Sequence, residues 1–258
     1  MPVEFFLFAG VGFLAQIVDG ALGMAYGVVS STVLLTFGVT PAVASASVHA
    51  AEMFTTAASA ISHTSHRNVD WRLFWRLAPA GILGGVLGTY VLTSIDGAML
   101  RPYVTAYLTV MGLYILYRAF RARRSVVDPH AAVVAPLGLV GGFVDAAGGG
   151  GWGPVVTTSL IGSGAAPRFV VGTVNTVEFF ITTAVSAAFL VAIFSGHWAE
   201  ADGIGGHIWS VAGLVVGGIL AAPLAGFVVK KIPGQRLMLM VGLLVIALAG
   251  YQTWQLLK

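Results

Sequence analysis

The stretch Phe143-Val-Asp-Ala-Ala-Gly-Gly-Gly-Gly-Trp-Gly-Pro154 decides the fold, because it interrupts an otherwise apolar segment at residues 133–162. Runs of glycine, and proline inside a helix, do not continue a helix well. A second apolar segment, residues 3–37, contains a similar stretch from Asp19 to Gly27. As one straight helix its 35 residues would be about 52 Å long, which exceeds the roughly 30 Å hydrocarbon core of a bilayer. Both segments are therefore predicted to be broken helices.

The rest of the chain is dominated by apolar residues. Of the 258 residues, 57% are hydrophobic and only 9% are charged, whereas a soluble domain carries about 25% charged residues. So few charges cannot cover the surface of a soluble protein of this size, so lipid must be its solvent. This composition excludes a soluble enzyme and a nucleic-acid-binding protein, and the absence of cysteine excludes disulfides and cysteine catalysis. The sequence predicts an all-α polytopic membrane protein with six further spans, at about residues 41–62, 77–95, 102–117, 166–194, 203–229 and 237–257.

The two broken segments belong to an internal repeat. Shifting the chain by 126 residues aligns residues 19–61 with 145–187 without a gap, and 14 of these 43 positions are identical. Composition alone would give roughly four identities. The matches include rare charged residues, since Asp19 meets Asp145 and Glu52 meets Glu178. Residues 1–124 are therefore predicted to form an N-terminal transmembrane repeat and residues 125–258 a C-terminal one, within a single integral-membrane unit.

The distribution of Lys and Arg predicts how the two repeats are oriented. If each broken segment enters and leaves on the same side, 11 of these residues face one side and 2, Arg101 and Lys258, face the other. If each broken segment crosses once, the count is 8 against 5. Because cytoplasmic loops are enriched in Lys and Arg, the first arrangement is favoured. Each half is then a broken or re-entrant hairpin plus three spans, the halves have inverted topology, and both termini lie outside the cytoplasm. Whether there are eight or ten helical segments stays open. Inverted repeats with broken helices are typical of secondary transporters.

Four acidic residues fall at membrane depth: Asp19, Glu52, Asp145 and Glu178. Intramembrane acids are costly and usually line a cavity, a proton path or an ion site. Glu52 and Glu178 are predicted near the midplane, and each lies on a polar helix face. The other members of these faces are Ser45, His49, Thr56, Ser59 and His63 in the first half, and Asn175, Thr182 and Ser186 in the second. Asp19 and Asp145 precede the glycines, where they could instead cap the N-terminus of the following half-helix.

The glycine breaks suggest their own chemistry. A helix that begins inside the membrane points free N–H groups into the protein, and such an end binds anions. Fourteen of the 34 glycines lie in the two broken segments, so we expect the excess of glycine to mark the breaks more than helix packing. Because no Lys or Arg is expected at midplane depth, an anion would be held by neutral donors. The same groups could instead hold a cation through carbonyl and carboxylate oxygens.

The quoted glycine-rich stretch, followed by Gly172-Thr-Val-Asn175, resembles the second-half signature of the TauE/SafE sulfite exporter family, also called the toluene-sulfonate uptake permease family. Asp19-Gly20, Gly23 and Ser45-Ala-Ser-Val-His49 resemble the weaker first copy of that signature. The resemblance implies an inner-membrane transporter of small sulfur-containing anions such as sulfite, organosulfonates or sulfoacetate, with export driven by an ion gradient. Because Leu22, Met24 and Ala25 stand where the second copy has glycine, the two half-sites are expected to be unequal.

Together these observations predict alternating access around one site between the two breaks, at the midplane. The residues expected to bind substrate are Gly23, Ser47, His49, Gly149, Gly150, Gly151, Trp152, Gly153, Thr173 and Asn175. Glu52 and Glu178, with Asp19 and Asp145, are expected to couple transport to a proton or sodium gradient, because a buried carboxyl group can exchange protons near neutral pH. No catalytic residue, metal site or cofactor is predicted.

Two other functions stay open. His49, Glu52 and Glu178 could ligate a divalent cation, and paired carboxylates could serve an intramembrane enzyme. No nucleophile motif accompanies these acids, and a repeat with two half-sites does not suit one catalytic centre. The expected partners are a small anion, the lipid bilayer and a second copy of the chain in a homodimer, with no nucleic acid.

Overall fold

The computed structural model describes residues 2–120, 131–163, 165–231 and 234–258, and every regular element in these ranges is a helix. The long helices are α1 (Val3–Leu22), α3 (Pro41–Ser65), α4 (Trp71–Ser94), α5 (Gly97–Phe120), α6 (Ala131–Gly148), α8 (Pro167–Phe194), α9 (Ile208–Lys231) and α10 (Gly234–Leu256). The shorter ones are α2 (Tyr26–Thr36), the π-helical turn η1 (Gly153–Thr157), α7 (Thr158–Gly162) and the 3₁₀ helix η2 (Ala201–His207). The predicted boundary at residues 124 and 125 lies outside the described residues.

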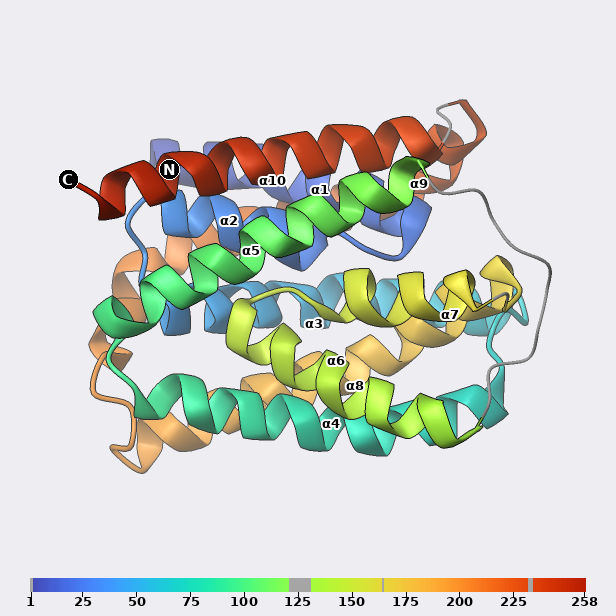
Figure 1. Cartoon of the computed structure of the whole chain (residues 1–258), viewed down its shortest axis with the longest axis horizontal. Coiled ribbons are helices and arrows are strands. Elements are labelled where there is room, and N and C mark those ends of the chain that lie inside the picture. Colours follow the sequence, from blue (N-terminus) through green and yellow to red (C-terminus); the bar gives the residue numbers. More distant parts are fainter. Residues whose placement is uncertain (1, 121–130, 164, 232–233) are drawn as a thin grey trace.

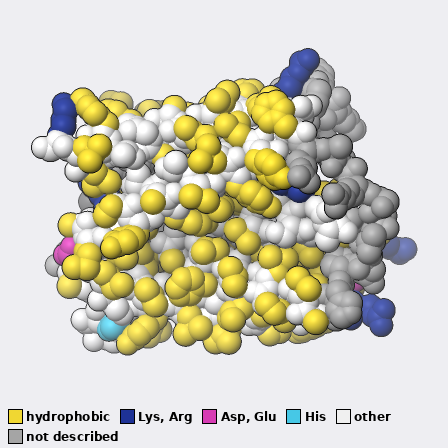
Figure 2. All heavy atoms as spheres, viewed as in Figure 1, with side chains coloured by type: hydrophobic (Ala, Val, Ile, Leu, Met, Phe, Trp, Pro, Cys, Tyr) yellow, Lys and Arg dark blue, Asp and Glu magenta, His cyan; other side chains and the backbone are white. Residues whose placement is uncertain are grey.

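Six of the described helices are long and apolar enough to cross a membrane: α1, α4, α5, α8, α9 and α10. Helix α3, where the sequence predicts a span at residues 41–62, is not among them, whereas α1, the first part of a broken segment, is. The six helices lie roughly along one axis of the molecule (Figure 1), and hydrophobic side chains cover the middle of the face seen in Figure 2, with charged side chains at the two ends. Large apolar side chains such as Trp75, Tyr103 and Phe194 are mostly exposed, as lipid-facing residues are. The chain is a multi-pass membrane protein. The span predicted at residues 203–229 corresponds to Gly205–Leu224, whose first residues belong to η2 and the rest to α9.

Both predicted interruptions are present. Helix α1 ends at Leu22, Gly23 takes a left-handed conformation with φ 66°, and α2 begins at Tyr26. Helix α6 ends at Gly148, and Gly149 and Gly150 have φ 68° and 148° before η1 begins at Gly153. A side chain at either of these positive angles is strained, which is why glycine is found there. The described residues thus contain ten α-helices, two of them short second arms after a break.

The two halves pack through each other. Helix α1 lies against α9, and α6 lies against α4, so the helix that precedes each break packs on a helix of the other half. Helices α3 and α8 pack on each other at the centre, and α5 packs on α10. Figure 1 shows that the chain runs in opposite directions in α5 and α10. Burial of α1 and α6 therefore depends on both halves being folded.

Glycines make much of this helix packing possible, which corrects the expectation that they chiefly mark the breaks. A Cβ at Gly84 of α4 would overlap the carbonyl oxygen of Leu139 in α6, and one at Gly142 would overlap that of Gly81. At the matching contact, a Cβ at Gly12 of α1 would lie 2.5 Å from the carbonyl oxygen of Leu214 in α9. Small residues let membrane helices approach to backbone contact. Sequence spacing alone does not tell such a packing glycine from one at a break.

Replacing Gly84 with Ala is expected to lower the melting temperature of the detergent-solubilised protein, because α4 and α6 must move apart. Overpacking of this kind costs about 1–3 kcal/mol. The matched control is Gly10→Ala in α1, where nothing lies within 4 Å of the added Cβ. Intrinsic tryptophan fluorescence during heating measures both variants. Equal melting temperatures for the two would mean that the α4–α6 contact tolerates a methyl group.

Candidate substrate site

The two breaks lie against each other at the centre of the molecule. A Cβ at Gly27 would lie 2.7 Å from Gly150 Cα, and one at Gly153 would lie 2.6 Å from Met24 Cα. Gly27 and Gly153 are equivalent under the 126-residue shift, so each break contacts the backbone of the other break through an equivalent glycine. The space directly between the breaks is filled by their own backbone.

A matched pair of hydrogen bonds joins the breaks. The Thr157 hydroxyl donates to the carbonyl oxygen of Gly23 at 2.9 Å, and the Ser31 hydroxyl donates to the carbonyl oxygen of Gly149. Ser31 corresponds to Thr157 and Gly23 to Gly149 in the repeat. These two hydroxyl residues were missed as site residues. Their equivalence under the shift was the signal that could have identified them.

Asp145 caps the second arm of its own half. Its Oδ1 accepts hydrogen bonds from the backbone N–H groups of Gly151 at 2.7 Å and Trp152 at 2.9 Å. Asp19 takes the corresponding place in the first half, but from the described residues it accepts one such bond, from the N–H of Tyr26 at 3.4 Å. Both aspartates thus have the capping geometry that the sequence left open. Two of the N–H groups expected to bind an anion are already bound to the Asp145 carboxylate.

His49 of α3 links the first half to Asp145. Its Nδ1 lies 2.8 Å from the carbonyl oxygen of Ser45, and its Nε2 lies 3.2 Å from Asp145 Oδ2. Because a carbonyl oxygen only accepts, Nδ1 carries a proton. The contact between Nε2 and the carboxylate then needs a second proton, on either the imidazole or the carboxyl group. This fully buried contact joins the two halves.

Asn175 is the repeat equivalent of His49, yet neither its amide nitrogen nor its amide oxygen has a hydrogen-bond partner among the described residues. The same holds for the Ser47 hydroxyl and for one carboxyl oxygen each of Glu52 and Glu178. All four side chains are at most 6% exposed. Because buried polar atoms are normally paired, we call Ser47, Glu52, Asn175 and Glu178 the unpartnered cluster. It lies on α3 and α8, the two central helices.

One member of the unpartnered cluster, Glu52, lies beside the first break. Glu52 Oε1 would lie 3.0 Å from a Cβ at Gly27. The carboxyl group of Glu178 lies within electrostatic reach of those of Asp19 and Glu52. The structure therefore brings together the four acidic residues that the sequence singled out, in one buried region.

Other predicted residues hold the scaffold. The Thr173 hydroxyl accepts a hydrogen bond from the N–H of Asp70 at 2.8 Å, which fixes the start of α4. Trp152 is fully buried and its indole N–H donates to the carbonyl oxygen of Val174 at 3.1 Å. Tyr107 of α5, which the sequence did not single out, donates to the carbonyl oxygen of Gly150 at 3.0 Å. Nothing in the repeat pattern pointed to Tyr107, because it lies outside the aligned residues.

Six apolar spans, two helices broken at their centres and a buried, unpartnered polar cluster beside the breaks together define a multi-pass membrane transporter. The chain belongs to the family described as Sulfite exporter TauE/SafE, whose model matches residues 8–252. It is 43% identical over 242 residues to the "Probable membrane transporter protein YtnM" of Bacillus subtilis (strain 168), covering 92% of this chain and 78% of the relative. No solved structure matches it. The family and this relative are membrane transporters, so the chain is a transporter of the sulfite exporter type and not an enzyme.

Proposed function

We propose that the protein exports small sulfur-containing anions, of the sulfite, organosulfonate or sulfoacetate type, across the inner membrane by alternating access. The observation that carries the proposal is the unpartnered cluster, in which an amide, a hydroxyl and two carboxyl groups on the central helices α3 and α8 are buried with atoms that have no partner among the described residues. The Asn175 amide and the Ser47 hydroxyl supply neutral donors for oxyanion oxygens. The name of the family, sulfite exporter, supports the substrate class and the direction.

Glu52 and Glu178 would couple the substrate to protons. An anion beside two ionised carboxylates is repelled, whereas protonated carboxyl groups can donate hydrogen bonds to it. Substrate and protons would therefore favour each other's binding. The geometry supports Glu52 and Glu178 for this role more than Asp19 and Asp145, because the aspartates bind backbone N–H groups. A sodium gradient is the alternative driving force.

The divalent-cation alternative has less support. Both ring nitrogens of His49 already have partners. Among the described residues, no group of three or more His, Asp or Glu side chains is arranged to hold a metal ion.

Uptake of radiolabelled sulfite into proteoliposomes tests the proposed substrate. We expect flux above that of protein-free liposomes, and competition by excess methanesulfonate or sulfoacetate. Sulfate and chloride at the same concentration serve as control competitors. A protein that carries sulfite no faster than empty liposomes, in both directions and with either gradient, would contradict the proposal.

We also propose inverted repeats with both termini outside the cytoplasm. The opposite courses of α5 and α10 support the inversion. The orientation is supported by Arg67, Arg72, Arg76, Arg118 and Arg168, which lie at helix ends on the side where α3 and α5 end and α4 and α8 begin. Basic residues concentrate on the cytoplasmic side.

Single cysteines test this orientation cleanly, because the chain contains no cysteine of its own. Ser94→Cys, at the end of α4, is expected to react with a membrane-impermeant maleimide in intact cells. Ser65→Cys, at the end of α3, is expected to react only after the membrane is opened. Both serines are exposed, so reagent access is matched. The reverse labelling pattern would place the termini in the cytoplasm.

A further inference from the structure

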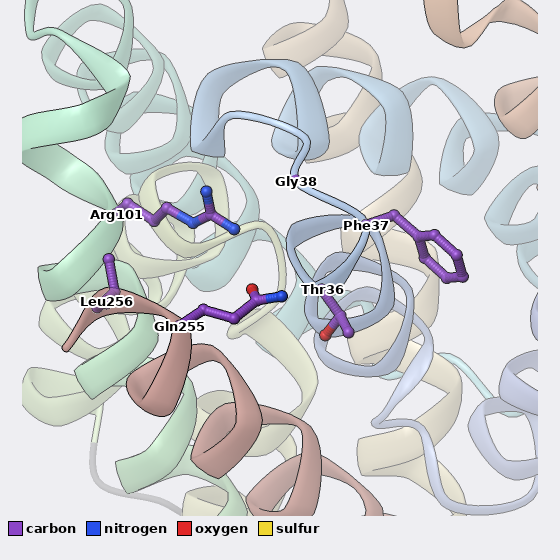
Figure 3. Close-up of a pocket in the computed structure, with 6 residues that line it drawn as sticks. All are labelled: Thr36, Phe37, Gly38, Arg101, Gln255 and Leu256. Carbon is purple, nitrogen blue, oxygen red and sulfur yellow. The ribbon is translucent and has the colours of Figure 1, made fainter. Parts of the chain in front are cut away.

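A pocket of about 510 Å³ opens at the end of the molecule where α2 and α10 finish and α5 begins. It is lined by Thr36, Phe37, Gly38, Arg101, Gln255 and Leu256. Figure 3 shows the guanidinium group of Arg101 and the amide of Gln255 extending from neighbouring helices toward Thr36 and Gly38, while the Phe37 ring points away. The pocket is separate from the unpartnered cluster, which lies on α3 and α8.

Arg101 brings an uncompensated positive charge to this pocket. One of its terminal nitrogens, Nη2, donates to the carbonyl oxygen of Leu35 at 3.0 Å. Its Nε is buried and has no hydrogen-bond partner among the described residues. No acidic residue lines the pocket, and none of the described acids forms an ion pair with Arg101. A buried guanidinium N–H without a partner is costly unless an acceptor binds there.

Helix capping explains only part of this arrangement. A cation near the last carbonyl groups of α2 complements the helix dipole. Arg118 takes a similar place at the other end of α5, since its Nη1 would lie 2.8 Å from a Cβ at Gly162, the last residue of α7. Capping accounts for the bond to Leu35, but it requires neither the pocket nor the unpaired Nε of Arg101.

We propose that this pocket is a second anion site, which binds a sulfonate or sulfite through the Arg101 guanidinium group and the Gln255 amide. A guanidinium group binds tetrahedral oxyanions in two-pronged geometry, and an amide N–H supplies a further donor. Helix α2 connects the pocket with the first break, since it begins at Tyr26 beside the break and ends at Thr36 in the pocket wall. Its 11 residues cover about 16 Å. The pocket would thus hold the anion at the entrance opposite the basic end. The ligand class, though not the site itself, rests on the proposed function.

Cysteine protection tests this site in the purified protein. Leu256→Cys places a thiol in the pocket wall without removing a polar group, and Leu256 is 41% exposed. The probe is methanesulfonate, because sulfite itself would consume the maleimide reagent. At ten times its dissociation constant, methanesulfonate is expected to slow labelling about tenfold, because only about a tenth of the pockets stay free. Sodium chloride at the same ionic strength should give no protection.

Substitutions at Arg101 show whether its guanidinium group holds the anion. Adding Arg101→Gln should abolish protection of the thiol at position 256, and Arg101→Lys should restore part of it. Ser94→Cys, at the same end but outside the pocket, should never be protected. Labelling that methanesulfonate leaves unchanged, or protection that survives Arg101→Gln in a protein of unchanged melting temperature, would overturn the proposal. Protection by inorganic phosphate equal to that by methanesulfonate would overturn the assignment to sulfur anions.

The outcome does not depend on transport. Protection without sulfite flux in proteoliposomes would leave this site standing while the proposed function fails. Sulfite flux without protection of the thiol would support the proposed function and overturn the pocket as an anion site.

Discussion

The double variant Glu52→Gln with Glu178→Gln is expected to lose gradient-driven sulfite transport while it still exchanges sulfite across the membrane at equal pH. Glutamine keeps the size and polarity of each side chain but cannot release a proton. One oxygen of each carboxyl group has no hydrogen-bond partner among the described residues, so the substitution breaks no hydrogen bond at that atom. Accumulation driven by a proton gradient should fall about 10- to 100-fold, the usual range for coupling between two sites.

The measurement is sulfite flux into proteoliposomes with and without a pH gradient. Glu4→Gln, at an exposed position near the start of α1, is the control for loss of a carboxyl group. The two single variants ask whether the equivalent residues contribute equally. Unchanged gradient-driven flux in the double variant would show that the coupling ion binds elsewhere.

The breaks could be predicted because they depend on local chemistry. Four consecutive glycines before Trp152 cannot remain in a membrane helix without cost, and the repeat extends this conclusion to the weaker first copy at Gly23. The structure places left-handed glycines at the equivalent positions Gly23 and Gly149. Each break also contains a second residue with positive φ, Ala25 at 140° in the first and Gly150 at 148° in the second, but these two positions are not equivalent under the shift.

The helix partners could not be predicted in the same way. The 126-residue shift says that α1 corresponds to α6, but it does not say which helices they touch. Each packs on the other half, through backbone contacts at Gly12 and Gly84. Such contacts join residues far apart in the sequence. In an apolar chain, hydrophobic periodicity has little power to choose among partners, because lipid-facing and buried faces are both apolar.

The roles of the acidic residues were only partly predictable. The sequence placed all four at membrane depth, and the structure gathers them in one region. Whether Asp145 caps a helix or faces a ligand depends on the direction in which the chain leaves Gly149, and several such directions are open to glycine. The hydrogen bond between His49 and Asp145 was not predictable, because it depends on how the two halves pack together.

Replacing Asp145 with Asn is expected to cost far more stability than replacing Asp19 with Asn, although the two residues are equivalent in the repeat. Asp145 binds two N–H groups at 2.7 and 2.9 Å and also contacts His49, whereas Asp19 binds one N–H group at 3.4 Å. Loss of one partner from a buried charged pair costs about 3–5 kcal/mol. Loss of a single long hydrogen bond costs about 1 kcal/mol.

Melting temperatures in detergent, followed by tryptophan fluorescence, compare the two variants. His49→Gln provides a further check, because removing either member of a coupled pair removes the same interaction. The double variant His49→Gln with Asp145→Asn should then lose less stability than the two single variants lose together. We expect the difference to be about 1–3 kcal/mol. Equal costs for Asp19→Asn and Asp145→Asn, or strict additivity with His49→Gln, would mean that the contact between the halves at Asp145 contributes nothing beyond the cap.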